Sequence, residues 1–150
     1  MWKYDYSSEY QQAKGLGLKP VLIHLKDYFE IVSCKGHLTN EAKPKDEINK
    51  YPLIGASKTN NGIINYISTF DCNPGFTLAK TGDGAAGYMF YHNYNFSIDK
   101  THVFYLQNRQ EIKNIDLNCK LISLQLHMVY NHSNAMTKDN FNDIWVYIYK

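Results

Sequence analysis

Residues 51–68 read YPLIGASKTNNGIINYIS, and this stretch decides the fold class. Its two ends, 51–56 and 63–68, are rich in β-branched and aromatic side chains, which favour strands. Between them lies a polar turn that contains Asn61-Gly62. Asn-Gly is the strongest short hairpin signal because both residues accept positive φ. The stretch therefore predicts two antiparallel strands joined by a turn.

Further short strands are predicted after this hairpin. Residues 76–79, 86–91 and 103–106 are apolar segments separated by turn-forming residues. Together with the hairpin they make five short strands with turns at short spacing. This arrangement predicts a compact antiparallel-rich sheet or an open barrel of short strands.

Beyond these strands the spacing of the apolar residues becomes helical. Two neighbouring apolar stripes cover residues 115–129, so one long helix is expected to pack on the sheet. Thr137 is the expected N-cap of a short helix over 138–143. Residues 144–149 (IWVYIY) consist of β-branched and aromatic residues and predict a closing C-terminal strand. The expected fold class is α+β.

The sequence before the predicted strands divides into a leader and the start of a domain. Residues 1–20 are expected to be a leader or linker, because glycines and Pro20 near its end discourage a continuous helix. A single domain is expected over residues 21–150. At its start the apolar residues of 25–32 share one helical face, which predicts a short helix ended by Gly36.

Composition excludes several classes of protein. With 150 residues, of which 44% are hydrophobic and 20% charged, the chain is expected to be globular rather than disordered. No apolar run approaches the roughly 18 residues of a membrane span. The N-terminus lacks the apolar stretch of a signal peptide. Three cysteines, an odd number, do not form a disulfide framework. These features predict a cytoplasmic protein.

One candidate catalytic set follows from residue order. Asp99, Glu111 and Lys113 stand in the order Asp…Glu-x-Lys, in which two carboxylates hold a metal ion and the lysine assists the attacking water. That chemistry requires the Glu and the Lys to alternate on a strand, whereas here they lead into the expected helix. A small metal-dependent nuclease is kept as an alternative function.

Metal and nucleotide sites are not predicted. Cys34 and His37 have ligand-like spacing, and His127 with His132 could complete a zinc set. The spacing of those two histidines, however, matches no single face of a helix. The glycine-rich residues 80–87 (KTGDGAAG) lead into a strand, so no helix N-terminus is available to hold a phosphate.

The polar turns are better suited to recognition. Residues 57–61, 80–83 and 92–95 carry amide, hydroxyl and ammonium groups. Asn can bind adenine through two hydrogen bonds, Lys reaches guanine acceptors, and Asp accepts from cytosine. If the turns project from one face of a rigid sheet, they could contact DNA together. The net charge of +2 is only a weak indication of such a partner.

A family resemblance rests on segments in a fixed order. Residues 51–57, 60–67 and 76–91 resemble the target recognition domain of type I restriction–modification specificity subunits and of related type II specificity chains. Upstream, residues 25–31 (LKDYFEI) look like the usual opening of the domain. Downstream, residues 141–148 (FNDIWVYI) look like its closing strand.

The resemblance covers about residues 21–150 and implies a function without catalysis. Such a domain reads one half of a split double-stranded DNA target. It positions a methyltransferase subunit and, in some systems, a restriction or motor subunit. S-adenosylmethionine would be bound by that methyltransferase, where base flipping and methyl transfer occur, so no cofactor is expected on this chain.

The expected DNA contacts come from the polar turns. They are Ser57, Lys58, Asn60, Asn61, Lys80, Thr81 and Asp83. The glycines Gly62, Gly84 and Gly87 are interpreted as residues that shape the backbone.

The chain also departs from the family pattern. A full specificity subunit has two recognition domains separated by long helices, whereas 150 residues hold one. We therefore expect either a half-subunit that pairs with a second copy of itself or with another chain, or a fragment or remnant. A remnant scaffold that serves as a protein-interaction domain is a further alternative function.

Overall fold

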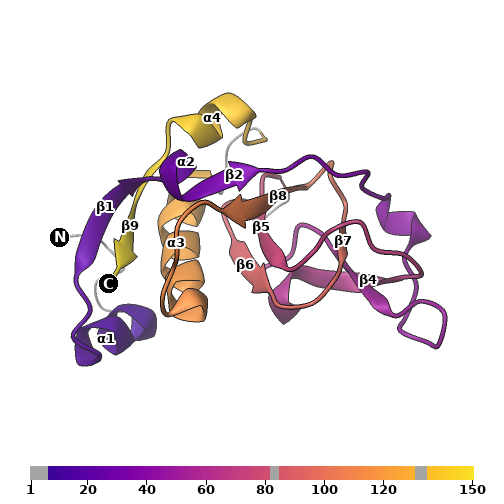
Figure 1. Ribbon diagram of the computed structural model, residues 1–150, viewed down its shortest axis with the longest axis horizontal. Helices are drawn as coiled ribbons and strands as arrows, with labels where there is room; N and C mark the ends of the chain where they lie inside the picture. The colour runs from indigo at the N-terminus through magenta and orange to yellow at the C-terminus, as the bar shows by residue number, and fades with distance from the viewer. Residues whose placement is uncertain (1–6, 82–84, 131–134) are drawn as a thin grey trace.

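The computed structural model describes residues 7–81, 85–130 and 135–150. Its strands form three sheets that follow one another along the longest axis of the molecule (Figure 1). All paired strands are antiparallel except β3 and β7. The predicted α+β class with antiparallel-rich sheets is confirmed, and the described strands do not close into a barrel.

The hairpin predicted from residues 51–68 forms one of the sheets. Strand β3 (Tyr51–Ile54) pairs antiparallel with β4 (Ile63–Ile67), and the turn between them contains the 3₁₀ turn η2 (Asn60–Gly62). The sequence did not predict β7 (Ser97–Ile98), a two-residue strand that lies parallel to β3.

The central sheet has the strand order β2-β8-β5-β6. Its strands are β2 (Phe29–Ile31), β5 (Gly75–Ala79), β6 (Met89–His92) and β8 (Val103–Asn108). Strand β5 is buried along its whole length, because it lies between two neighbouring strands and both of its faces are covered.

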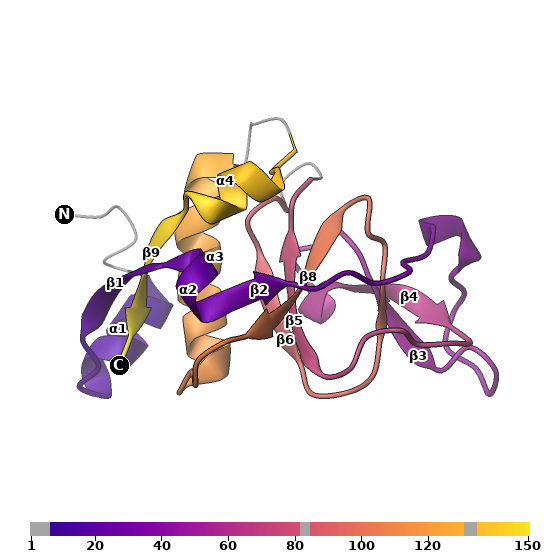
Figure 2. The ribbon, with the colours of Figure 1, turned by 45° about the horizontal axis from the view of Figure 1, so that its top comes forward.

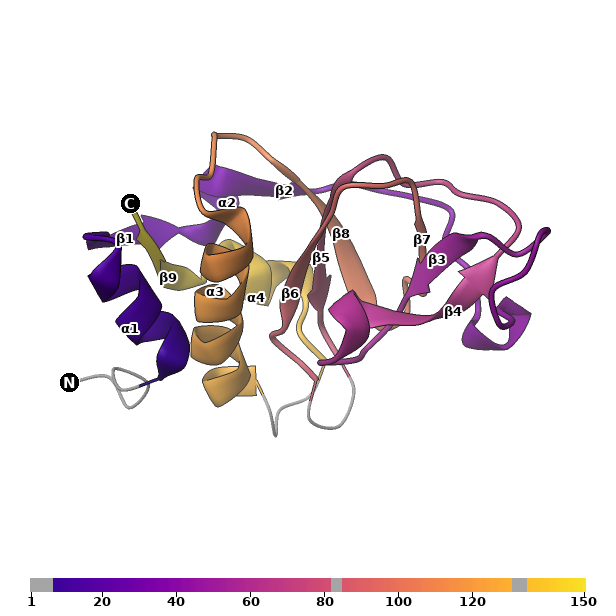
Figure 3. The ribbon, with the colours of Figure 1, turned by 90° about the horizontal axis from the view of Figure 1, so that it is seen from below.

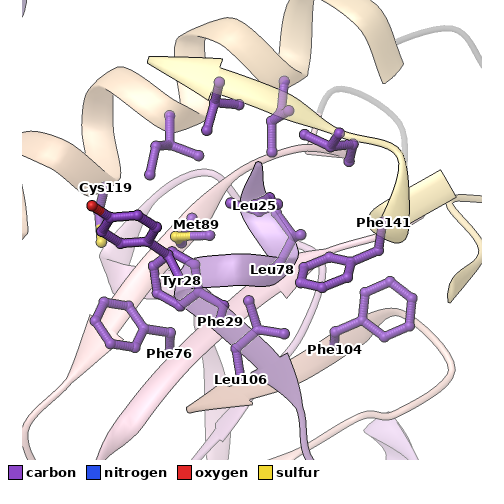
Figure 4. Close-up of a cluster of buried hydrophobic side chains, with 14 of the residues drawn as sticks. Leu25, Tyr28, Phe29, Phe76, Leu78, Met89, Phe104, Leu106, Cys119 and Phe141 are labelled. Carbon is purple, nitrogen blue, oxygen red and sulfur yellow. The ribbon is translucent and has the colours of Figure 1, made fainter. Parts of the chain in front are cut away.

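The long helix α3 (Ile115–Tyr130) confirms the prediction for residues 115–129. It packs against β6 on one side and against the C-terminal strand β9 (Trp145–Tyr149) on the other (Figure 3). Figure 4 shows the core beneath it, where Phe76, Leu78 and Leu106 of the sheet meet Cys119 of α3 and Phe141. None of the helices in the described ranges is long and apolar enough to span a membrane.

A short helix lies beside this core, and a 3₁₀ turn lies near β4 at the other end of the molecule (Figure 1). Helix α4 (Lys138–Asn142) begins at the predicted cap, since the Thr137 side chain accepts from the Asn140 N–H at 3.0 Å and the Asn140 side chain accepts from the Thr137 N–H at 3.0 Å. The 3₁₀ turn η1 (Thr39–Glu41) follows the extended segment after β2.

The segment before Val21 contributes α1 (Ser8–Gly15), a helix that the sequence did not predict. Its Ala13 is fully buried, and α1 packs against α3 beside the sheet of β1 (Pro20–His24) and β9 (Figure 2). The glycines after Lys14 therefore end a helix rather than prevent one.

The helix expected over residues 25–32 is wrong beyond its first turn. Helix α2 covers Leu25–Tyr28, and Phe29 to Ile31 form β2 against β8. Leu25, Tyr28 and Phe29 still face the core, so their apolar spacing was informative. Residues 29–31 are extended because their backbone hydrogen-bonds to β8.

Candidate nucleic-acid interface

The turn between β3 and β4 is stabilised by its own side chains. The Ser57 hydroxyl accepts from the Thr59 N–H at 3.2 Å and donates to the Thr59 carbonyl at 3.1 Å. Asn60 and Asn61 have φ of 53° and 54°, and Gly62 has φ of 78°. A Cβ at Gly62 would also lie 3.1 Å from Ile54 and Phe90. The Asn-Asn-Gly sequence therefore fits a left-handed turn packed on the sheet.

Asn61 joins this turn to the one that follows β6. Its Nδ2 lies 3.0 Å from the Tyr91 carbonyl, 3.1 Å from the Tyr94 hydroxyl and 3.3 Å from His92 Nδ1. His92 is fully buried, and its Nε2 lies 2.8 Å from the Thr77 hydroxyl. Burial lowers the pKa of His92 from 6.5 to about 3, so its ring is neutral.

These two turns form what we call the asparagine-rich end. Its members are Ser57, Lys58, Asn60, Asn61, His92, Asn93 and Tyr94. Lys58, Asn60 and Asn93 are exposed. Beside it, Asn61, Tyr91 and Tyr94 face residues 111–116 across an open groove of about 670 Å³.

The candidate nuclease residues are not brought together. Glu111 and Lys113 line that groove, in the segment between β8 and α3 rather than on a strand. Asp99 is 3% exposed and does not line the groove. Its carboxylate accepts from the Thr39 hydroxyl at 2.5 Å and from the Thr101 N–H at 3.1 Å. Nothing in this arrangement favours the nuclease alternative.

A second polar surface lies where β5 ends. Lys80, Lys100 and Lys138 line one depression of about 160 Å³. Burial, and then the charge of Lys138, lowers the pKa of Lys80. In the described part of the chain, none of the three lysines forms an ion pair with a carboxylate. We call this surface the lysine-rich end.

Neighbouring groups extend the lysine-rich end. Thr81 Oγ1 lies 2.5 Å from His102 Nδ1, and Lys80 Nζ lies 4.6 Å above the Phe104 ring. An adjoining depression of about 220 Å³ shares Lys138 and is also lined by Lys26 and Arg109. Arg109 lies 3.6 Å from Glu30, so part of its charge is compensated.

The structure does not gather the three polar turns at one end of the sheet. In the β5–β6 pair, Gly75 lies opposite His92 and Leu78 opposite Met89. The asparagine-rich end and the lysine-rich end therefore lie at opposite ends of this pair of strands. The structure joins turn 57–61 to turn 92–95 but separates Lys80 and Thr81 from both.

The remaining predicted residues have mixed outcomes. Asp83 and Gly84 lie outside the described residues. Gly87 has φ of 96°, and a Cβ there would lie 2.5 Å from the His127 backbone nitrogen. Gly87 thus lets the chain pass directly beside α3, as its interpretation as a backbone-shaping residue requires.

Sequence reasoning missed Lys100, His102 and Lys138. They reach Lys80 through main-chain contacts, because the Lys80 N–H donates to the His102 carbonyl at 2.9 Å and the Met136 N–H donates to the Lys80 carbonyl at 2.8 Å. No local pattern signals this meeting of three separate segments.

The zinc set considered from the sequence is not assembled. His127 Nδ1 lies 2.9 Å from the Ala86 carbonyl, on the side of α3 that meets the turn before β6. His132 lies outside the described residues. Cys34 and His37 have other neighbours, Asp71 and Cys72.

Comparison with known proteins identifies relatives over most of this fold. The family model for the type I restriction modification DNA specificity domain matches residues 21–147. A Mycoplasma pneumoniae protein named as a type I specificity subunit, S.MpnORF507P, is 30% identical over 104 residues. A second, S.MpnORF285P, is 26% identical over 113 residues.

The matches cover most of this chain but a smaller share of those proteins. The two alignments cover 69% and 75% of this chain, and 26% and 36% of the relatives. This chain therefore spans about a quarter to a third of the relatives' lengths.

Solved structures share the fold. The S subunit of a type I restriction–modification system from M. genitalium matches 96% of this chain and 39% of its own, with a TM-score of 0.64 and 14% identity. The HsdS subunit from Thermoanaerobacter tengcongensis matches 92% of this chain and 37% of its own, with a TM-score of 0.56 and 12% identity.

Proposed function

The chain belongs to the family of type I restriction modification DNA specificity domains, and we propose that it reads one half of a split double-stranded DNA target. The observation that carries this proposal is the lysine-rich end, where three lysines gather and none forms an ion pair among the described residues, although the charge of Asp99 partly offsets that of Lys80. A polyanion such as the DNA backbone relieves the mutual repulsion of such cations.

In this proposal the lysines position the duplex and the adjacent turn reads it. Contacts to phosphate fix register and orientation, whereas contacts to base edges carry sequence information. Lys80, Lys100 and Lys138 take the phosphate role. Thr81 takes the role of a base contact at this end, and Asp83, which follows it closely in the sequence, stays a predicted base contact.

The asparagine-rich end has a different role in this proposal. The Ser57 and Asn61 side chains already bond within the protein, and Asn60 Nδ2 lies 3.3 Å from the Ile63 carbonyl. Ser57 and Asn60 thus stabilise their own turn, and Asn61 holds the two turns together. Lys58 is the exposed cation of this end and offers at most one backbone contact.

Chemistry is assigned to partner chains. The domain would hold DNA while a methyltransferase subunit binds S-adenosylmethionine, flips the base and transfers the methyl group. A restriction or motor subunit would cut in some assemblies. A second copy of the chain, or another specificity chain, would read the other half of the target.

Selection from a pool of randomised duplexes tests the function. The full chain, alone and together with its methyltransferase, should enrich one short sequence after repeated rounds of binding and sequencing. With magnesium or manganese and plasmid, the chain alone should leave the DNA intact. Absence of enrichment in both arms contradicts the proposal. Binding to a protein partner without any DNA binding would favour the remnant scaffold instead.

A further inference from the structure

Two cysteines from distant parts of the chain meet beside a carboxylate. Cys34 follows β2, and Asp71-Cys72 precedes β5. The two Sγ atoms and one carboxylate oxygen of Asp71 all lie within 4.8 Å of one another. Both cysteines are free thiols, and Cys72 is fully buried.

An imidazole lies beside Asp71, outside the set of atoms that all lie within 4.8 Å of one another. His37 Nε2 lies 3.6 Å from Asp71 Oδ2, while His37 Nδ1 lies 2.9 Å from Glu41 Oε2. Metal-binding histidines usually direct their second ring nitrogen at a carboxylate, which fixes the ring and raises its basicity. Glu41, at the end of η1, supplies that carboxylate.

The backbone holds these side chains in place. The Gly36 N–H donates to Asp71 Oδ2 at 3.0 Å, which joins the two segments directly. The His37 N–H donates to the Ile98 carbonyl and the Cys72 N–H to the Phe96 carbonyl, each at 2.9 Å. The donor groups are thus arranged before any ion arrives.

The donor set suits one class of metal. Zinc binds thiolate sulfur at about 2.3 Å and imidazole nitrogen at about 2.0 Å, so tetrahedral ligand atoms lie roughly 3.5 Å apart. The donors of Cys34, Cys72 and Asp71, already within 4.8 Å of one another, need only small shifts to reach this spacing, whereas His37 Nε2, 3.6 Å from Asp71 Oδ2, would also have to turn toward the sulfur atoms. Soft thiolates favour zinc over magnesium or calcium.

We propose that Cys34, Cys72 and Asp71, with His37 as the fourth ligand, form a structural Zn²⁺ site. The ion would tie the segment after β2 to the segment before β5, next to strand β7 of the sheet β4-β3-β7. The sequence alone does not predict this site, because Cys34 and His37 are far from Asp71 and Cys72 in the chain.

The site also touches the lysine-rich end. A Cβ on Gly36 would lie 2.7 Å from Lys100 Cγ, so the Lys100 stem packs directly on the backbone between Cys34 and His37. An ion here would hold that backbone, and with it the stem of Lys100. This consequence rests on the proposed function, whereas the metal site itself does not.

Cobalt provides a direct test on the full chain under reducing conditions. Titration with Co²⁺ should produce thiolate-to-cobalt charge-transfer absorption that saturates at one ion per chain and disappears when Zn²⁺ is added. Cys34→Ser should weaken binding by about 100-fold or more, because loss of an outer partner alone costs about 10- to 100-fold. Glu41→Gln should weaken Co²⁺ binding by about 10- to 100-fold.

The matched control is Cys119→Ser, which removes the third free thiol, buried in α3 and remote from the site. It should leave the titration unchanged. Circular dichroism checks the fold of each variant, and if Cys34→Ser is unfolded, His37→Asn decides. The proposal is overturned if the reduced wild type shows no thiolate–cobalt absorption, or if the Cys34→Ser and His37→Asn spectra equal the wild-type spectrum. It is also overturned if the thiols form only a disulfide on oxidation and bind no ion when reduced.

Discussion

The polar residues at the two ends of the β5–β6 pair differ in whether other groups of the protein satisfy them. At the asparagine-rich end, Asn61 and His92 satisfy one another and the nearby Tyr91 carbonyl. At the lysine-rich end, Lys80 and Lys138 raise each other's electrostatic energy. Polar groups that are satisfied internally stabilise a fold, whereas cations gathered without carboxylate partners indicate an anionic ligand. The difference separates turns that stabilise the fold from the surface that we propose to contact DNA.

Glycine substitutions at the two ends sharpen the comparison most. Gly87→Ala should destabilise the protein by about 3 kcal/mol, because the left-handed φ and the approach to α3 both resist a side chain. Gly62→Ala should cost about 1 to 2 kcal/mol, since its neighbours are side chains that can move. Urea unfolding measures both.

Gly15→Ala is the matched control, because Gly15 lies at the end of α1 with no atom near its missing side chain. It should be neutral or slightly stabilising. A Gly87→Ala variant as stable as this control would show that the chain beside α3 is not constrained.

His92 should make stability depend on pH. Its pKa in the folded protein lies below its ordinary 6.5, at about 3. Below pH 6.5 the unfolded chain takes up a proton that the folded chain refuses, so the free energy of unfolding falls as the pH falls. Between pH 7 and pH 5 the loss should be about 2 kcal/mol.

Unfolding of wild type and of His92→Gln at both pH values measures this loss. His92→Gln should be less stable than wild type at pH 7. Its free energy of unfolding, however, should fall by less than that of wild type between pH 7 and pH 5. Equal pH dependence of the two proteins would show that His92 is already charged in the folded state.

The smallest effect separates the two asparagines of one turn. Asn61→Ala should cost about 1 to 2 kcal/mol, because its amide bonds to the Tyr91 carbonyl and Tyr94. Asn60→Ala should cost less, since it has a similar φ but bonds only to the Ile63 carbonyl. Thermal unfolding of the pair compares them, and an equal loss would mean that backbone strain alone sets the cost.

Local chemistry made part of the fold predictable. The hairpin at 51–68, the helix at 115–129 and the Thr137 cap depend on neighbours in sequence, and the structure has all three. Strand β2 could not be foreseen, because Phe29 to Ile31 adopt the conformation that pairing with the distant β8 imposes. The family resemblance, carried by residues 51–91, is confirmed by the match to residues 21–147.

The candidate sites were harder to predict for the same reason. Lys80 and Thr81 stand in a polar turn that the sequence shows, but Lys100 and Lys138 join them only through packing. Likewise, Cys34 and His37 form a recognisable pair, whereas Asp71 and Cys72 reach them only when the chain folds. Residue type identifies candidates, and tertiary contacts decide which of them act together.

The dependence of DNA affinity on salt tests the central claim most directly. Each phosphate contact contributes about 0.9 to the slope of log K against log salt concentration. Two charge-matched triple variants are compared with wild type by fluorescence anisotropy. The first is K80A/K100A/K138A, and the second, K43A/K45A/K58A, removes exposed lysines beside Tyr66 of β4 and in the turn between β3 and β4. The first should reduce the slope by about 2 to 3 and the second by less than 1. The opposite ranking would place the duplex beside β4 and contradict the account.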